Sequence, residues 1–215
     1  MKLSTTTRLS IAALSIAALA SCAATTQLTS SWSDPAAANR GFKKIAVVGA
    51  TPKSATRRMF EDDFVANLQK RGITGVQSYT FAGEGQIDKE TAIAKLKEMG
   101  VDGVIVTRLI DKETVQTYYP PTYSSVAAPA PYYGGWYGYY SMGYSYQSSP
   151  GYVAEDHVFR IETNLYDVQN DKLLWSGLTE TTLSSGSAPE SEVKPFIDLI
   201  TYNMEQKKVL PKAKK

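Results

Sequence analysis

Residues 114–154 contain no Asp, Glu, Lys or Arg, and this run constrains the fold more than any other feature of the sequence. Eleven of the fourteen tyrosines lie between Tyr118 and Tyr152, interleaved with glycines, serines and five prolines. Such prolines exclude a regular helix, and a segment with few aliphatic side chains cannot build its own core. We interpret residues 118–152 as a long Tyr-, Gly- and Pro-rich loop, so the core must come from the segments on either side.

Before this loop, short apolar runs alternate with amphipathic segments. The predicted elements are a strand at 42–50, a helix at 54–71, a strand at 73–79, a helix at 88–100 and a strand from 104 to about 117. In the first helix, Phe60, Phe64 and Leu68 recur at every fourth position and form one apolar face. The order β-α-β-α-β predicts a sheet whose neighbouring strands are parallel.

After the loop, residues 159–166 alternate between apolar and polar side chains, which predicts a half-buried strand. Residues 173–183 are its predicted hairpin partner across a turn at Asn170-Asp171. An amphipathic helix is predicted from Val193 to Met204, with Pro195 in its first turn. The whole is a single α/β domain over residues 42–210, with a mixed β-sheet built from β-α-β-α-β, an antiparallel hairpin and a C-terminal helix.

The first 22 residues predict export. Lys2 and Arg8 precede an apolar stretch at 11–20 that is too short to span a membrane. Residues 19–22, Leu-Ala-Ser-Cys, resemble the bacterial lipobox. We predict that residues 1–21 are a signal peptide, that cleavage follows Ser21, and that Cys22 carries the lipid. An ordinary signal peptide with an unrelated cysteine is the alternative, but the only Cys of the chain stands where the lipobox requires it.

Several acyl chains on one cysteine hold a protein stably at a membrane. Residue 23 is Ala rather than Asp, which in enterobacterial lipoproteins favours transfer to the outer membrane. We therefore expect a protein that is lipid-anchored in the cell outer membrane, facing the periplasm, and whose lipid partner is the membrane itself. Residues 22–41 are expected to be a lipidated tether, although Trp32 suggests that the fold begins near Ser31.

Without its signal peptide the chain carries 21 basic and 21 acidic residues. A neutral chain lacks the basic face of a nucleic-acid binder, so no nucleic-acid partner is expected. Residues 211–215 form a basic tail that we expect to be solvated. One Cys and one His are too few for a disulfide, a Cys-based zinc site or a multi-histidine metal centre. We predict no metal site and no cofactor.

No catalytic residue is predicted. The segment 49–54 lies where a phosphate loop would, but it lacks the glycine pattern of one and is interpreted as a plain strand–helix turn. Asp156 and His157 are neighbours in a strand and point to opposite faces. The acidic residues at 61–63 are expected on the solvated face of their helix, with Arg57 and Glu61 forming a pair at i and i+4.

Four stretches resemble a family of small proteobacterial outer-membrane lipoproteins whose function is unknown. These stretches are FKKIAVVG at 42–49, RRMFEDDF at 57–64, VIVTRL at 104–109 and ETNLYD at 162–167. The Tyr/Gly-rich insertion before the last stretch is also typical of that family. The resemblance implies a lipid anchor and brings no catalytic residues with it.

The aromatic loop is the candidate contact surface. Tyrosine and tryptophan offer a large amphipathic contact area at a low cost in rotamer entropy. The loop can also be a poorly ordered excursion that becomes ordered on binding, or a site where aromatic rings stack on sugars. The candidate contact residues are Tyr132, Tyr133, Trp136, Tyr137, Tyr139 and Tyr140.

The leading hypothesis for function is a non-enzymatic envelope module that binds an envelope protein or a glycan, or serves in structure or assembly. The alternatives are a periplasmic hydrolase and a glycan-binding protein. A pocket in which acidic or His side chains converge would favour the hydrolase.

Overall fold

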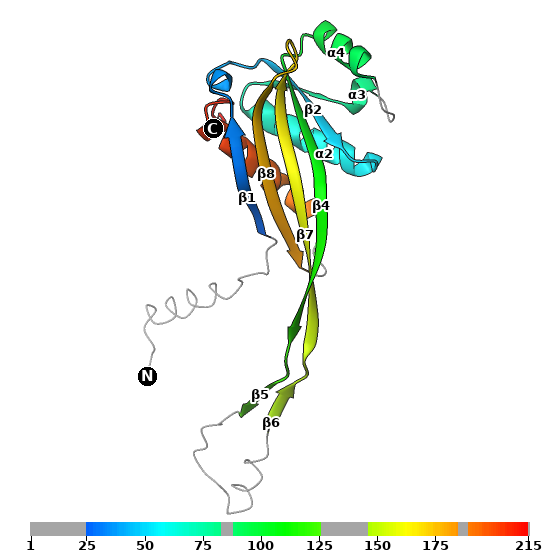
Figure 1. Ribbon diagram of the computed structural model, residues 1–215, viewed down its shortest axis with the longest axis vertical. Coiled ribbons are helices and arrows are strands. Elements are labelled where there is room, and N and C mark those ends of the chain that lie inside the picture. The colour runs from blue at the N-terminus through cyan, green and yellow to red at the C-terminus, as the bar shows by residue number, and fades with distance from the viewer. Residues whose placement is uncertain (1–24, 83–87, 126–145, 185–188, 215) are drawn as a thin grey trace, which may run out of the picture.

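The computed structural model describes residues 25–82, 88–125, 146–184 and 189–214. Its main feature is a six-stranded sheet in the order β1-β8-β7-β4-β2-β3 (Figure 1). The strands are β1 (Thr25–Ser33), β2 (Lys44–Ala50), β3 (Thr74–Gln77), β4 (Gly103–Tyr119), β7 (Tyr152–Asp167) and β8 (Leu173–Ser184). The pairs of β2 with β3 and with β4 are parallel, and the pairs among β4, β7, β8 and β1 are antiparallel. The predicted α/β domain with a mixed sheet is therefore confirmed.

Helices lie on both faces of this sheet (Figure 1). The helices are α2 (Ser54–Lys70), α3 (Tyr79–Ala82), α4 (Lys89–Glu98) and α6 (Val193–Gln206), with short 3-10 turns η1 (Pro35–Ala37) and η2 (Pro189–Glu192). The predicted C-terminal helix is confirmed as α6, and Pro195 falls in its first turn. None of the described helices is long and apolar enough to cross a membrane.

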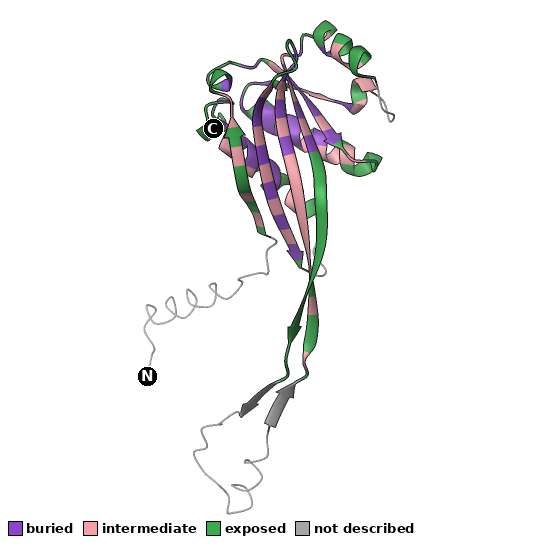
Figure 2. Cartoon of the chain, in the orientation of Figure 1, coloured by how far each residue is buried: buried purple, intermediate pink, exposed green. Residues whose placement is uncertain are grey.

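The main core lies between the sheet and the helices α2 and α6. Phe64 and Leu68 of α2 and Ile200 of α6 are fully buried in it, as the apolar periodicity predicts. Trp175 of β8 lies across Gly177, where an added Cβ would approach the indole ring to 2.2 Å. A smaller core of Ala46, Leu96, Val101 and Val168 lies on the opposite face, under α4. Figure 2 shows the buried residues gathered where the helices cover the sheet, and we call this region the compact part of the molecule.

The predicted tether at 22–41 is wrong from residue 25 onward. Residues 25–33 form β1, an edge strand that pairs antiparallel with β8 from Thr25↔Thr182 to Ser33↔Trp175. The backbone N–H of Asp34 then donates to the carbonyl of Leu174, and Ala37 is buried in the core. The physical reason is that β8 has a second open edge, which β1 covers with backbone hydrogen bonds that need no apolar pattern.

The predicted loop at 118–152 is also wrong at both of its ends. The β4–β7 ladder runs on to Tyr119↔Tyr152, and beyond it β5 (Thr122–Ser125) pairs with β6 (Tyr146–Ser149). Thr, Val and Tyr fit a pleated strand well, so these ends form ladder where the composition indicated loop. Residues 126–145 lie outside the described part of the chain.

The C-terminal segment runs along the end of α2. Val209 and Leu210 are buried, and the backbone N–H of Lys214 donates to the carbonyl of Lys70 at 2.8 Å. The residues before Lys215 in the predicted basic tail are exposed, but Lys214 is tied through its backbone to the domain.

Candidate functional site

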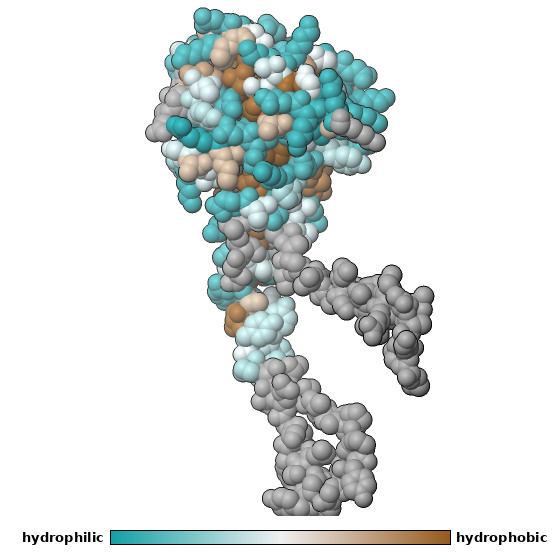
Figure 3. Space-filling model, turned by 180° about the vertical axis from the view of Figure 1, so that it is seen from behind, coloured by the Kyte–Doolittle hydropathy of each residue, from teal (hydrophilic) through white to brown (hydrophobic). Residues whose placement is uncertain are grey.

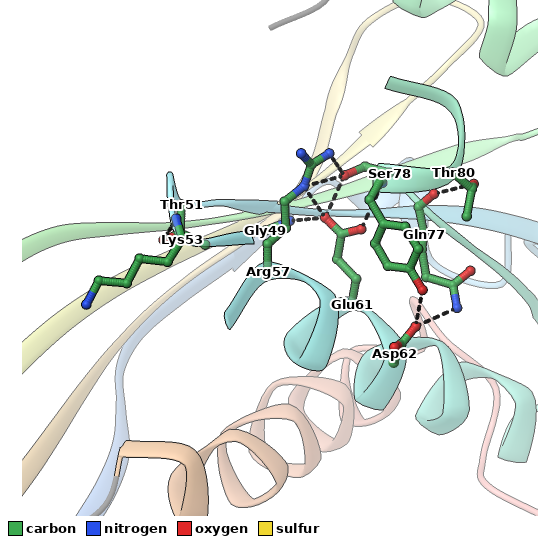
Figure 4. A network of polar contacts seen from close by, with 10 residues as sticks. Gly49, Thr51, Lys53, Arg57, Glu61, Asp62, Gln77, Ser78 and Thr80 are labelled. Atoms are coloured by element: carbon green, nitrogen blue, oxygen red, sulfur yellow. Dashed lines mark hydrogen bonds and ion pairs between the residues drawn. The ribbon is translucent and has the colours of Figure 1, made fainter. Parts of the chain in front are cut away.

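A buried carboxylate lies where β2 and β3 end. Glu61 of α2 is fully buried, and its carboxylate accepts hydrogen bonds from the backbone N–H of Gly49 at 2.9 Å and of Tyr79 at 3.2 Å. It also accepts from the Oγ of Ser78 at 2.5 Å and pairs with the Nε of Arg57 at 3.1 Å (Figure 4). The expected pair at i and i+4 is confirmed.

The expectation that Glu61 lies on a solvated face is wrong. Glu61 lies one position after Phe60 on α2 and points to the ends of the parallel strands, where backbone donors surround it. Its neighbour Asp62 is exposed and accepts from the phenol of Tyr79 at 2.6 Å. This hydrogen bond raises the pKa of Tyr79 above its ordinary value.

In α/β sheets, ligands bind outside the carboxyl ends of strands whose connections leave to opposite faces. The end of β2 leads to α2 on one face and the end of β3 leads towards α4 on the other. Here, however, Glu61 is out of reach of solvent and its oxygens are occupied by four donors. A fully satisfied network of this kind makes the local structure rigid, so we assign it to holding α2 against the sheet.

The second distinctive region is a projection of the sheet. β4 pairs with β2 only as far as Ala50↔Arg108, and β7 pairs with β8 only as far as Asp156↔Ser184. Beyond these points β4 and β7 continue as a ribbon of two strands, which we call the arm (residues 116–119 and 152–155). Figures 1 and 3 show the arm leaving the compact part of the molecule as a narrow projection.

The arm exposes apolar and aromatic side chains on both of its faces. Tyr118 is 64% exposed and lies opposite Val153, which is 55% exposed. On the other face, the rings of Tyr119 and Tyr152 stack with their centroids 4.9 Å apart. A ribbon of two strands with no core beneath it is marginally stable in water. Its exposed rings make the arm a candidate contact surface.

The side of β4 that faces away from β7 is open from Leu109 to Tyr119. Among the described residues, no strand pairs with β4 on this side beyond Arg108. Eleven residues of strand span about 36 Å at 3.3 Å each. We call residues 109–119 the free edge of β4.

Along the free edge of β4, charged side chains occur only at residues 111–113, in the part nearest the core. Arg160 of β7 contacts Asp111, Glu113 and Glu180, and these hydrogen bonds raise its pKa. From Thr114 onward the strand carries no charge.

The single histidine lies beside the arm without a catalytic arrangement. The Nδ1 of His157 lies 3.1 Å from the Oγ1 of Thr114. The register pairs His157 with Leu183 and Asp156 with Ser184, so the two neighbours take opposite faces of the sheet. Within the described ranges, no three His, Cys, Asp or Glu side chains gather as a metal site.

The residues singled out from the sequence lie outside the described part of the chain. These are Cys22 and the candidate contact residues Tyr132, Tyr133, Trp136, Tyr137, Tyr139 and Tyr140. The described part of this region is the arm, which leads towards the aromatic loop. The predicted third strand, to about Thr117, covers most of β4, but the extension of β7 from Phe159 back to Tyr152 was missed because it lacks the apolar alternation by which strands are found in a sequence.

Comparison with known proteins gives likeness in fold only. No protein-family model and no curated protein sequence matches the chain. Among solved structures, a PelC dodecamer from Paraburkholderia phytofirmans is similar, with 18% identity and a TM-score of 0.44 over 83% of this chain and 96% of that one. Lipoprotein GNA1162 from Neisseria meningitidis is also similar, with 16% identity and a TM-score of 0.42 over 76% of this chain and 99% of that one.

Proposed function

We propose that this protein is a non-enzymatic lipoprotein of the outer membrane that binds another envelope protein by adding a strand of it to the free edge of β4. The observation that carries the proposal is the open, exposed edge of β4 beyond Arg108. The predicted lipidation of Cys22 supplies the anchor, and the sequence at 19–23 supports it.

An open strand edge presents unpaired backbone N–H and C=O groups that pair readily with another chain. Natural sheets protect such edges with charged residues, prolines, bulges or short strands. In β4, a bulge at Ile110 and the charged residues at 111–113 protect only the part near the core. Residues 114–119 carry neither charge nor proline, which favours use of this edge in binding.

The space beside the free edge fits a single extended segment. On the core side of Arg108, β2 already pairs with this edge of β4, so an incoming strand must end at Arg108. The edge strand of a second copy, β1, belongs to a sheet that continues on its far side through β8. A flexible segment of a different envelope protein carries no such sheet and can end at Arg108.

Proline scanning tests the proposal, because successive residues of β4 point their N–H groups alternately to β7 and to the free edge. Of Gln116→Pro and Thr117→Pro, one therefore removes a donor from the free edge alone and keeps the β4–β7 ladder. That variant is recognised by amide hydrogen exchange, because it leaves the N–H groups of residues 152–155 protected in the β4–β7 ladder. We expect it to recover at least about tenfold less partner from crosslinked envelopes, as for a loss of about 1.4 kcal/mol.

The matched control is the same pair of substitutions on the opposite edge of the arm, Val153→Pro and Ala154→Pro. The member of that pair that keeps the β4–β7 ladder protected should recover the partner at the wild-type level. Wild-type recovery by the β4 variant that loses only a free-edge donor would overturn the proposal, as would recovery of a second copy of this chain alone.

A further inference from the structure

Helix α4 stands away from the sheet and leaves a slot of about 430 Å³. The slot lies on the face of the sheet opposite α2 and α6. Its helical wall and its floor are mostly apolar. They include Ala92, Ile93 and Leu96 of α4, Val104 and Val106 of β4, and Tyr166 of β7.

The helix contacts the rest of the fold near both of its ends. At its N-terminus the Nζ of Lys89 pairs with Asp171 of the β7–β8 turn at 2.6 Å. Towards its C-terminus Leu96 is buried in the smaller core with Val101 and Val168. Asp88 caps the helix by accepting from the backbone N–H of Thr91.

The chemistry of the lining limits what the slot can hold. Water molecules in such a space would lack polar partners over most of the surface. A protein strand would find no free backbone edge, because side chains form the walls. The volume lies within the range of small-molecule sites, which are mostly apolar with a few polar groups. The polar lining residues are Lys89, Tyr166, Asp167 and Asp171, and the Nζ of Lys89 pairs with Asp171.

We propose that this slot binds one unbranched hydrocarbon chain, with the polar end of the ligand at the Lys89–Asp171 pair. The lining residues of α4 run from Lys89 to Leu96, about 10 Å at 1.5 Å per residue. This length suits a medium acyl chain or part of a longer one. The inference does not depend on the function proposed for the free edge of β4.

The chain comes from an external lipid rather than from the protein's own anchor. The slot lies near the end of the sheet where Ser33 of β1 pairs with Trp175. Cys22 precedes Thr25, at the other end of the nine residues of β1. The strand alone spans about 30 Å, which separates the start of β1 from the slot.

The inference is tested by measuring how dodecanoate displaces the apolar fluorescent probe N-phenylnaphthylamine from the full mature chain. We expect saturable binding below the micelle concentration. Ala92→Phe and Val106→Phe fill the slot from opposite walls, and each should weaken binding at least about tenfold. Two variants are used because either alone could disturb folding, which the thermal midpoint reports.

Ala66→Phe is the matched control, because Ala66 is exposed on α2, on the far side of the sheet. It should bind dodecanoate like the wild type. The inference is overturned if the wild type does not bind dodecanoate. It is also overturned if a folded Ala92→Phe or Val106→Phe variant binds as tightly as the wild type.

Discussion

At the scale of the residue, Glu61 shows which contacts the sequence predicts and which it does not. Its pairing with Arg57 follows from helical spacing alone. Its complete burial does not, because three of its four donors lie in Gly49, Ser78 and Tyr79, which only the folded sheet brings together. The burial of Phe64, by contrast, was predictable from the apolar repeat of its own helix.

Replacing Glu61 by Gln should destabilise the protein by about 3 kcal/mol. The substitution removes the charge that pairs with Arg57 and turns an amide N–H₂ towards existing donors, and breaking a buried ion pair costs about this much. Urea unfolding measures the change. Asp63→Asn, two residues further along α2 and partly exposed, should change the free energy of unfolding by less than about 0.5 kcal/mol. Equal effects of the two substitutions would show that the hydrogen-bond network around Glu61 does not hold α2 against the sheet.

Phe64→Ala should lower the free energy of unfolding by about 3–5 kcal/mol, because it leaves a cavity in the main core. The side chain is fully buried and contacts the ring of Phe60 at a centroid distance of 5.6 Å. Tyr202→Ala, on the exposed side of α6, is the control and should have little effect. A loss below about 1 kcal/mol at Phe64 would contradict the packing described for α2.

At the scale of the element, strands were predictable where a pattern of apolar residues marks them. β2, β7 and β8 were found in this way, whereas β1 was not, since Thr, Ser and Gln dominate it. Its partner β8 is about 150 residues away in sequence, as the Thr25↔Thr182 pair shows. Pairing over such a distance is decided by which edges remain open in the folded sheet, and no local pattern reports it.

Helix α4 should lose stability in acid through its cap. The N–H of Thr91 donates to the Asp88 carboxylate, and this bond lowers the pKa of Asp88 in the folded state. A lowered pKa contributes stability that is present above the unfolded pKa and is lost as the pH falls through the folded one. Urea midpoints measured from neutral pH down to about pH 3 should therefore fall less steeply for Asp88→Asn than for the wild type. Parallel curves would contradict the role of this cap.

At the scale of the whole molecule, the compact part and the arm are separable in energy. The core lies within the compact part, and the arm residues are exposed or only partly buried. The composition of residues 114–154 predicted a segment that contributes little to the core, and among the residues of this segment that the structure describes none belongs to either core cluster. It did not predict that β7 begins at Tyr152 rather than near Phe159, because backbone pairing leaves no trace in composition.

Replacing residues 119–152 by Asn-Gly, a favoured hairpin turn, should leave the domain folded. The shorter connection lowers the entropy cost of closing the hairpin, so the free energy of unfolding should change by no more than about 1 kcal/mol. Circular dichroism and urea unfolding check this. Loss of the folded state would show that the tyrosines belong to the core.

The central claim, that the free edge of β4 binds another envelope protein, is tested most directly by photo-crosslinking in intact envelopes. A benzophenone side chain replaces Tyr118 on the arm or, as a control, Tyr202 on α6. Both positions are exposed to a similar degree. The account predicts an adduct with one different envelope protein from position 118 and none from position 202. That adduct should disappear in the proline variant that blocks the free edge. An adduct that persists in that variant, or the absence of any adduct from position 118, would contradict the account.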